Sequence, residues 1–239
     1  MNLSSKMYDK FTVANNIEKL TEPVFVIDNK YYWYIRSKRK IFHNPAPCDL
    51  VEPFNSIVND FIRKETGSAS FHLYDTVNNL QEDIAVIFVE NKNDFLAYLH
   101  VSFPSGWRPE DRIGQSFAKI HEEVPGFVFN PALMQTLLRG RYQRFVWSPI
   151  YENKLNQYPG ESRKFTLDNP QFWLKIEKQI TVGFPAEGFF LFVMRQYVYD
   201  EKDVDLRVFC NTIRGMSPIQ KIYKGITAEF EGWLYAKIR

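Results

Sequence analysis

The sequence predicts an α+β fold, in which an antiparallel sheet fills the middle of the chain and short helices accompany it. Two pairs of apolar runs have the length and composition of strands: residues 84–89 with 95–103, and residues 172–182 with 187–199. A short turn separates the members of each pair, so each pair predicts a hairpin. From residue 204 onward the apolar spacing is helical. Strands and helices do not alternate regularly, which argues against a parallel sheet.

The first part of the chain is predicted to contain a lead-in and a small hairpin. Residues 1–20 are polar, and we expect them to be a poorly fixed lead-in. The remaining residues, 21–239, fit one domain. Residues 24–27 and 31–35 are predicted to be strands, joined by a turn at residues 28–30.

A loop and a helix are expected before the first long hairpin. Residues 43–53 contain three prolines and are predicted to be a loop. Residues 54–64 carry apolar side chains at helical spacing. Residues 69–74 fit either a helix or a strand.

Two short helices are predicted between the hairpins. In the first, residues 113–121, four side chains at spacings of three and four share one face: Ile113, Phe117, Ile120 and His121. The second covers residues 131–138, with Asn130 as its N-cap and Pro131 in its first turn.

The remaining elements are a strand, a connection and the C-terminal helices. Residues 145–151 are predicted to be a strand, and the polar residues 152–170 an exposed connection. Helical spacing predicts helices over residues 204–213 and 218–236.

Composition limits the classes of function. A net charge of +2 argues against a dedicated nucleic-acid binder, since the only dense basic run, residues 36–40, fits a solvated turn. Two cysteines, Cys48 and Cys210, are too few for a disulfide framework or a four-thiolate iron–sulfur cluster.

No glycine-rich turn follows a strand, so we expect no nicotinamide or flavin site. The N-terminus lacks the apolar stretch of a signal peptide, and no apolar run is long enough for a membrane helix. We therefore expect a cytoplasmic protein.

His121 is the histidine whose position suggests chemistry. It lies at the end of a predicted helix, on the apolar face. Such a ring commonly donates to a carbonyl group of the core or caps the helix. The alternative is a neutral imidazole offered to a metal in an apolar pocket, as in a haem site. His100, in a predicted strand, is the reserve candidate, and Cys48 is a third.

Several motifs in one order resemble the haem-dependent oxidative N-demethylase alpha-subunit family. Together they span roughly residues 20–235. They are Leu-Gln-Glu-Asp at 80–83, Phe-Pro-Ser-Gly-Trp at 103–107, Gly114, Ile-His at 120–121 with Val-Pro at 124–125, Arg144 with Trp147, Ile-Glu-Lys-Gln at 176–179, Met-Arg-Gln-Tyr at 194–197 and Tyr-Lys-Gly at 223–225.

The resemblance implies a haem-binding PAS-like domain over residues 21–239, with an N-terminal extension and C-terminal helices. It implies haem b, with His121 as the axial metal ligand. Four further side chains are expected at the cofactor, two of them as guanidinium partners of the propionates: Arg195, Arg144, Trp147 and Phe117.

The same resemblance implies an enzyme that oxidises a small amine with dioxygen. Glu82, Asp83 and Glu177 are the expected catalytic carboxylates, which hold the amine cation or relay protons. The alternative for Glu82 and Asp83 is that they are solvated residues at a strand end. Electrons are expected from a flavin or iron–sulfur reductase subunit. A non-catalytic haem-binding PAS sensor or carrier is the main alternative, and a scaffold that binds another apolar ligand is a third.

Three positions depart from the family pattern. The family carries arginine where Lys178 stands and asparagine where Val146 stands, and it has basic residues where the segment 183–188 has none. Lysine cannot make a bidentate contact, and valine removes a hydrogen-bonding side chain. We therefore expect haem binding to be retained more securely than the identity of the substrate.

Overall fold

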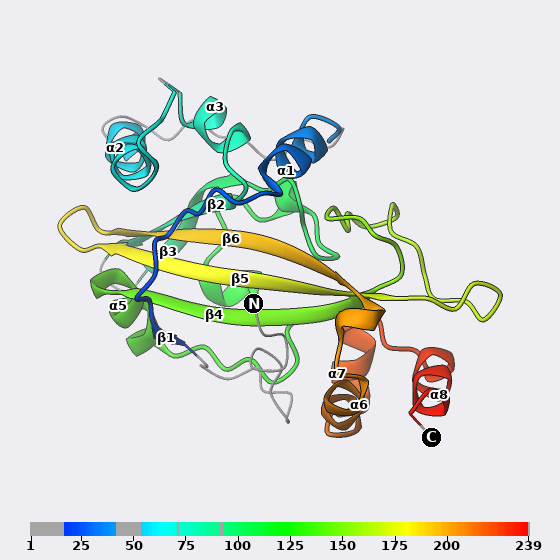
Figure 1. Cartoon of the computed structure of the whole chain (residues 1–239). Coiled ribbons are helices and arrows are strands. Elements are labelled where there is room, and N and C mark those ends of the chain that lie inside the picture. The colour runs from blue at the N-terminus through cyan, green and yellow to red at the C-terminus, as the bar shows by residue number, and fades with distance from the viewer. Residues whose placement is uncertain (1–16, 42–53, 71, 91–92, 239) are drawn as a thin grey trace.

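The computed structural model describes residues 17–41, 54–70, 72–90 and 93–238. Within these ranges the chain forms a six-stranded antiparallel sheet with helices on both faces and at one end (Figure 1), which confirms the predicted α+β class. In order across the sheet the strands are β1 (Glu18–Lys19), β4 (Arg141–Ile150), β5 (Trp173–Phe184), β6 (Phe189–Asp200), β2 (Asp83–Glu90) and β3 (Asn93–His100).

Both predicted hairpins form, and they lie side by side. β2 pairs with β3, and β5 pairs with β6 along its whole length. β6 also pairs with β2, which joins the two hairpins into one sheet. The strand predicted at residues 145–151 is the greater part of β4, which pairs with β5.

Side chains alternate along β6, so each face of the sheet has its own core. Leu191 and Val193 pack with the face that α2 (Phe54–Thr66) and α3 (Leu73–Asn78) cover. Phe190 and Met194 pack with the opposite face, which α4 (Phe117–Ile120) and α5 (Pro131–Arg139) cover. The predicted N-cap of α5 is confirmed, because Asn130 accepts a hydrogen bond from the backbone N–H of Ala132 at 2.9 Å.

Three helices follow β6 and cover one end of the sheet: α6 (Leu206–Arg214), α7 (Pro218–Tyr223) and α8 (Ala228–Ala236). Phe209 and Phe230 are fully buried there among the side chains of β4 and β5. The single helix predicted over residues 218–236 is wrong. Gly225 takes a φ of +69°, a left-handed conformation that ends one helix before the next begins.

The predicted N-terminal hairpin is also wrong. Residues 24–27 form no strand, and residues 31–35 belong to helix α1 (Tyr31–Lys38). The helix is stabilised by tertiary contacts: Tyr34 donates its hydroxyl to the carbonyl of Gln196, and Lys38 pairs with Asp83 at 3.2 Å. Because one buried residue in this pattern is a lysine, the apolar spacing alone does not reveal the helical face.

Other expectations need smaller corrections. The helix predicted over residues 113–121 is only the four-residue α4. Gly114 has a φ of +79°, which is not helical, so the helix begins after it. The connection over residues 152–170 is not wholly exposed, since Leu155 and Phe165 are buried. The loop at 43–53, with His43 and Cys48, and residues 1–16 of the predicted lead-in lie outside the described residues.

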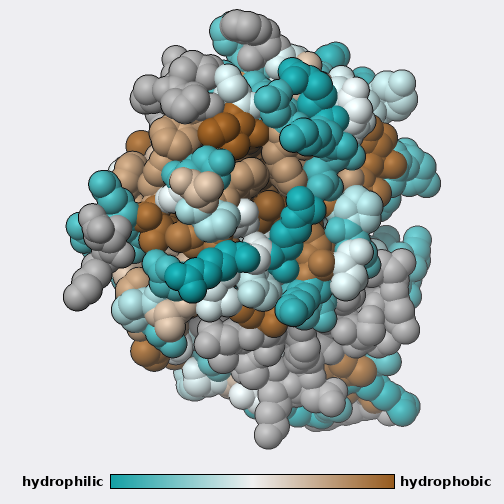
Figure 2. Space-filling view, turned by 90° about the vertical axis from the view of Figure 1, so that its left-hand side faces the viewer, coloured by the Kyte–Doolittle hydropathy of each residue, from teal (hydrophilic) through white to brown (hydrophobic). Residues whose placement is uncertain are grey.

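Apolar side chains also reach the surface. Figure 2 looks onto the end of the molecule that is at the left of Figure 1, and apolar residues gather there between hydrophilic ones around a hollow. None of the helices in the described ranges has the length and apolar character needed to cross a membrane.

Candidate functional site

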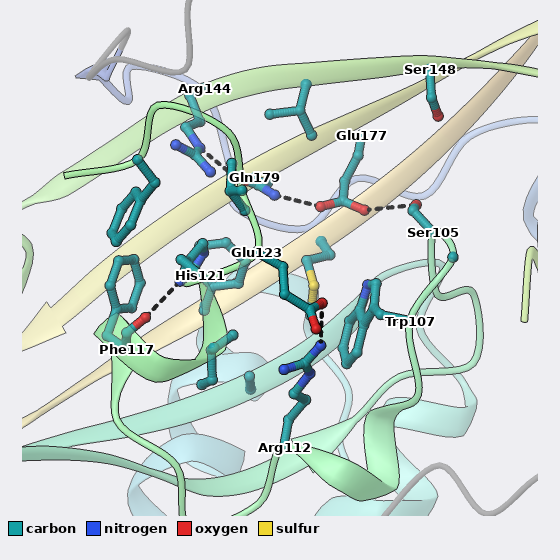
Figure 3. Close-up of a pocket in the computed structure, with 18 of the residues that line it drawn as sticks. Ser105, Trp107, Arg112, Phe117, His121, Glu123, Arg144, Ser148, Glu177 and Gln179 are labelled. Atoms are coloured by element: carbon teal, nitrogen blue, oxygen red, sulfur yellow. Dashed lines mark hydrogen bonds and ion pairs between the residues drawn. The ribbon is translucent and has the colours of Figure 1, made fainter. Parts of the chain in front are cut away.

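A cavity of about 430 Å³ lies on the face of the sheet that α4 covers (Figure 3). This volume falls within the range of pockets for small molecules and cofactors. Strands β2, β3 and β6 supply an apolar wall, and β4 and β5 supply a polar one. The apolar wall is made by Ala85, Ile87, Leu96, Leu99, Phe192 and Met194, and the polar side chains of the other wall are Arg144, Ser148, Lys175, Glu177 and Gln179.

His121 lines this cavity at the C-cap of α4. Ser116 begins the helix by accepting a hydrogen bond from the backbone N–H of Lys119 at 3.2 Å. The Nδ1 atom of His121 lies 2.8 Å from the carbonyl oxygen of Phe117. A carbonyl only accepts, so Nδ1 carries the proton, and Nε2 keeps its lone pair. The bond to a core carbonyl expected from the sequence is therefore present, in a ring that also lines the cavity.

The surroundings of His121 keep its ring neutral. The imidazole packs against the rings of Phe117 and Phe127, with centroid distances of 4.2 and 5.1 Å. Burial lowers the pKa of His121 to about 4, while the bond to Phe117 opposes the shift and Arg144 adds to it. At neutral pH the ring is therefore an uncharged imidazole, the form that binds metals.

Glu177 places a carboxylate in the cavity. Gln179 donates its side-chain amide to Oε1, and Gln196 donates to Oε2. The hydroxyl of Ser105 lies 3.5 Å from Oε2, on the loop that follows β3. A carboxylate that accepts from two amides is held in one orientation and keeps lone pairs for further donors.

Arg144 brings a positive charge to the same wall. Its Nε donates to the side-chain oxygen of Gln179. Among the residues that the structure describes, its two terminal nitrogens have no hydrogen-bond partner. Burial lowers the pKa of Arg144, although Glu177 opposes the shift. Figure 3 shows the guanidinium directed from β4 into the cavity.

Two lysines add to this charge. Lys224 donates to the carbonyl of Trp147 at 2.6 Å and lies over the rings of Trp147 and Tyr223. Lys175 is buried at the sheet. Burial lowers the pKa of each lysine to about 8. Arg112 and Glu123 form an ion pair at 3.3 Å and balance each other, so the cavity has more cations than anions.

A family model described as haem-dependent oxidative N-demethylase, alpha subunit-like, matches residues 54–231. The chain belongs to this family. Its description indicates haem-dependent oxidative chemistry, and the term alpha subunit implies a partner subunit. No curated protein matches the chain.

The expected site residues of this family member fall into two groups. His121, Phe117, Arg144, Trp147 and Glu177 all line the cavity, although they come from separate parts of the sequence. Residues distant in sequence are thus brought together by the pairing of β4 with β5 and by the turn that carries α4.

The second group does not line the cavity. Arg195 pairs with Glu82 at 2.6 Å and with Asp28 at 2.7 Å, beneath α1. Asp83 pairs with Lys38 of the same helix. Arg195 points to the face of the sheet opposite the cavity, because it follows Met194 on an extended strand. The sequence groups Glu82, Asp83 and Arg195 with His121, and the structure separates them.

His100, the reserve candidate, is also away from the cavity. It pairs with Ile84 across β2 and β3, and its ring meets the edge of Tyr74 of α3 at 4.9 Å. It is fully buried, and neither ring nitrogen has a hydrogen-bond partner in the described part of the chain.

Several cavity residues had no role assigned from the sequence: Ser105, Lys175, Gln179, Tyr223 and Lys224. A signal for three of the wall residues was present. Lys175, Glu177 and Gln179 are polar at alternate positions of a mostly apolar strand, which places them on one face. Tyr223 and Lys224 were recognisable only as part of the family motif.

The structure distinguishes two of the departures from the family pattern. Val146 lines the cavity and lies opposite Glu177 in the pairing of β4 with β5. Lys178 lies on the other face of the sheet, where it pairs with Glu22 at 2.7 Å. Only the change at Val146 alters the wall of the cavity.

Proposed function

We propose that the protein is a haem-dependent oxidoreductase that oxidises a small amine with dioxygen, and that His121 is the axial ligand to the iron of haem b. The observation that carries this proposal is a neutral, fixed imidazole in an apolar cavity whose charged side chains are mostly cations. Membership of the family supports the same reaction class.

The environment of His121 fits a haem ligand. Histidines that bind metals usually donate their other ring N–H to a carbonyl or carboxylate, which fixes ring and tautomer. Phe117 provides such a carbonyl. No group of three or more His, Cys, Asp or Glu side chains within the described ranges is suited to hold a bare metal ion. His121 would therefore hold iron whose other ligands come from a macrocycle.

The remaining cavity residues fit the rest of the cofactor. The apolar wall formed by side chains such as Ile87, Leu99 and Phe192 suits a porphyrin face. Haem carries two propionates, and Arg144 and Lys224 are the cations that would pair with them. The terminal nitrogens of Arg144 are available for a bidentate contact with a carboxylate.

Haem, when bound, supplies dioxygen activation and one-electron chemistry. The chain supplies orientation and proton handling. Glu177, held by the amides of Gln179 and Gln196, would bind the N–H of a protonated amine and accept its proton. Trp107 and Phe192 would exclude water beside it. In this proposal Glu82 and Arg195 act on the opposite face, beneath α1, and Asp83 ties α1 to the sheet through Lys38.

The sheet topology supports the PAS-like part of the proposal. The five long strands lie in the order β4, β5, β6, β2, β3, with helices inserted between β3 and β4. PAS domains have this strand order and this position for their helices. Electrons would come from a separate flavin or iron–sulfur reductase subunit, which agrees with the implied partner subunit.

Spectra and oxygen uptake test the proposal. Purified protein reconstituted with haem should show a Soret band that changes in His121→Ala and not in the exposed-site control His72→Ala. With a small secondary amine and a reductant, it should consume dioxygen and release an aldehyde. Haem binding without turnover would identify the sensor or carrier instead, and failure to bind haem would refute both.

A further inference from the structure

Two buried charged side chains hold the turn at residues 103–107. The backbone N–H of Phe103 donates to Asp83 Oδ2 at 2.9 Å. The ammonium of Lys175 donates to the carbonyl oxygens of Phe103 and Pro104, both at 3.2 Å. Lys175 is 1 % exposed, so these bonds form without competition from water.

Lys175 also joins this turn to a second loop. Its third donor bond goes to the carbonyl of Leu155 at 2.7 Å. Two backbone bonds connect the same segments: Gly106 donates to the carbonyl of Gln157 at 2.9 Å, and Gln157 donates to that of Pro104 at 3.0 Å. The ammonium on β5 is therefore a common anchor for two loops.

The anchored turn forms one wall of the cavity. Ser105, Gly106 and Trp107 line it, and Ser105 lies beside Glu177. In Figure 3, Trp107 and Ser105 lie on one side of the cavity and His121 on the other. The position of the turn therefore decides how much room is left between Trp107 and His121.

We propose that Lys175 is a positioning residue, whose buried ammonium fixes the turn that carries Ser105 and Trp107 as the cavity wall opposite His121. The consequence of this anchoring for the reaction rests on the function proposed above, whereas the effect of Lys175 on the turn does not require haem. Three carbonyl acceptors match the three N–H groups of an ammonium. A residue without those donors leaves three carbonyls unpaired in a dry site, which is costly.

Protonation gives this anchor a pH dependence. Burial lowers the pKa of Lys175 to about 8, and the two carboxylates near it, Glu177 on β5 and Asp83 on β2, oppose the shift. The two loops present backbone carbonyls to it. Above this pH the neutral amine has two N–H groups, so one carbonyl loses its donor and the turn loosens.

Fluorine NMR of protein labelled with 5-fluorotryptophan tests the proposal on the full chain without haem. The chain has five tryptophans, and Trp107→Phe assigns the signal of interest. In the wild-type protein the Trp107 signal should shift between pH 7 and 9 with a midpoint near 8. In Lys175→Met it should be displaced at pH 7 and should no longer titrate.

Lys178→Met is the matched control, because Lys178 is buried on the same strand but points to the other face. It should leave the Trp107 signal and its titration unchanged. A Trp107 signal that is identical in Lys175→Met and wild type overturns the proposal. If Lys175→Met does not fold, Lys175→Gln replaces it in the same comparison, and a Trp107 signal identical to that of the wild type overturns the proposal.

A second measurement addresses the reaction. Lys175→Met should still bind haem, because His121 is unchanged, but its KM for the amine should rise about tenfold or more as the wall moves. An unchanged KM overturns the proposal. Failure of wild-type protein to bind haem refutes the proposed function alone, since the NMR result remains interpretable.

Discussion

The Nδ1 atom of His121 donates to the carbonyl oxygen of Phe117 at 2.8 Å, one helical turn earlier in the chain. The bond uses a carbonyl that the short helix α4 leaves free at its end. It sets the orientation of the ring before any ligand is present, and it assigns the tautomer. A ligand at Nε2 would therefore meet a ring that needs little reorganisation.

If His121 is the axial ligand, His121→Gly should lower haem affinity about tenfold or more and change the Soret band. Added imidazole should restore the wild-type spectrum, because the small ligand can occupy the space that the His121 ring leaves beside Phe117 and Phe127. Absorption titrations measure both effects, with His72→Gly as the control. A spectrum that is unchanged in His121→Gly would contradict the assignment.

Removing the charge of Arg144 should weaken haem binding without changing the axial ligand. A charge-assisted hydrogen bond contributes about 1.5–3 kcal/mol, so Arg144→Gln should raise the Kd roughly 10- to 100-fold. The Soret position should stay constant. Arg141→Gln is the matched control on the same strand, since Arg141 is half exposed and pairs with Glu65. Equal losses in both variants would show that the effect is not specific.

Val146→Asn should change amine binding more than haem binding. The substitution introduces an amide into the cavity wall opposite Glu177, and one hydrogen bond contributes about 0.5–1.5 kcal/mol. We expect the Kd for an amine to change about two- to tenfold. Lys178→Arg, which also restores the family residue but on the other face, should change neither Kd. Spectral titrations of the haem-loaded protein with amines measure this.

Much of the sheet was predictable because its strands are long and apolar. The runs that became β2, β5 and β6 are marked by apolar composition and by turn residues between them. The helix α2 was predictable because its buried side chains, such as Val58 and Ile62, are apolar and regularly spaced. The local sequence pattern is sufficient to predict an element where the buried side chains of that element are also its apolar ones.

The candidate site was only partly predictable. Arg195 and Glu177 are both charged residues in apolar strands, and alternation alone does not tell which face carries the cavity. That face is set by where α1 and α4 pack. The position of α1 depends on buried polar residues, Tyr34 and Lys38, whose partners are distant in sequence. Such contacts leave no periodic signal, so the apolar pattern of residues 31–35 predicts a strand where α1 forms.

Stability should fall in acid partly because of His100. Burial lowers the pKa of His100 to about 3, below the ordinary value of 6.5. Between these values the unfolded chain binds the proton and the folded chain does not, so stability falls as the pH drops from 6.5 towards 3. The slope for one such group is on the order of 1 kcal/mol per pH unit.

Urea unfolding at pH 7 and 5 measures this slope. His100→Phe keeps a ring beside Tyr74 and removes the titrating group, so its stability should depend less on pH than that of the wild type. His72→Phe, at an exposed position, should keep the wild-type slope. A His100→Phe variant with an unchanged slope would contradict the assignment.

Two glycines should respond to alanine in opposite directions. At Gly183 an added Cβ would lie 2.1 Å from the carbonyl oxygen of Leu138, a backbone atom of α5. Gly183→Ala should therefore push α5 away from β5 and cost about 1–3 kcal/mol. Gly232 lies in helix α8 with open space around it, so Gly232→Ala should stabilise by about 0.5–1 kcal/mol. Denaturant titrations measure both, and a neutral Gly183→Ala would contradict the close approach.

The cavity draws its walls from residues as far apart as Ala85 and Lys224. When His121 leaves the ribosome during translation, both strands of the β5–β6 hairpin and Lys224 are still missing from the folded part of the chain. An enclosed space for a large planar guest would therefore exist only after translation of nearly the whole matched region. Such a ligand would then bind late, after translation, and would not serve as a nucleus around which the polypeptide folds.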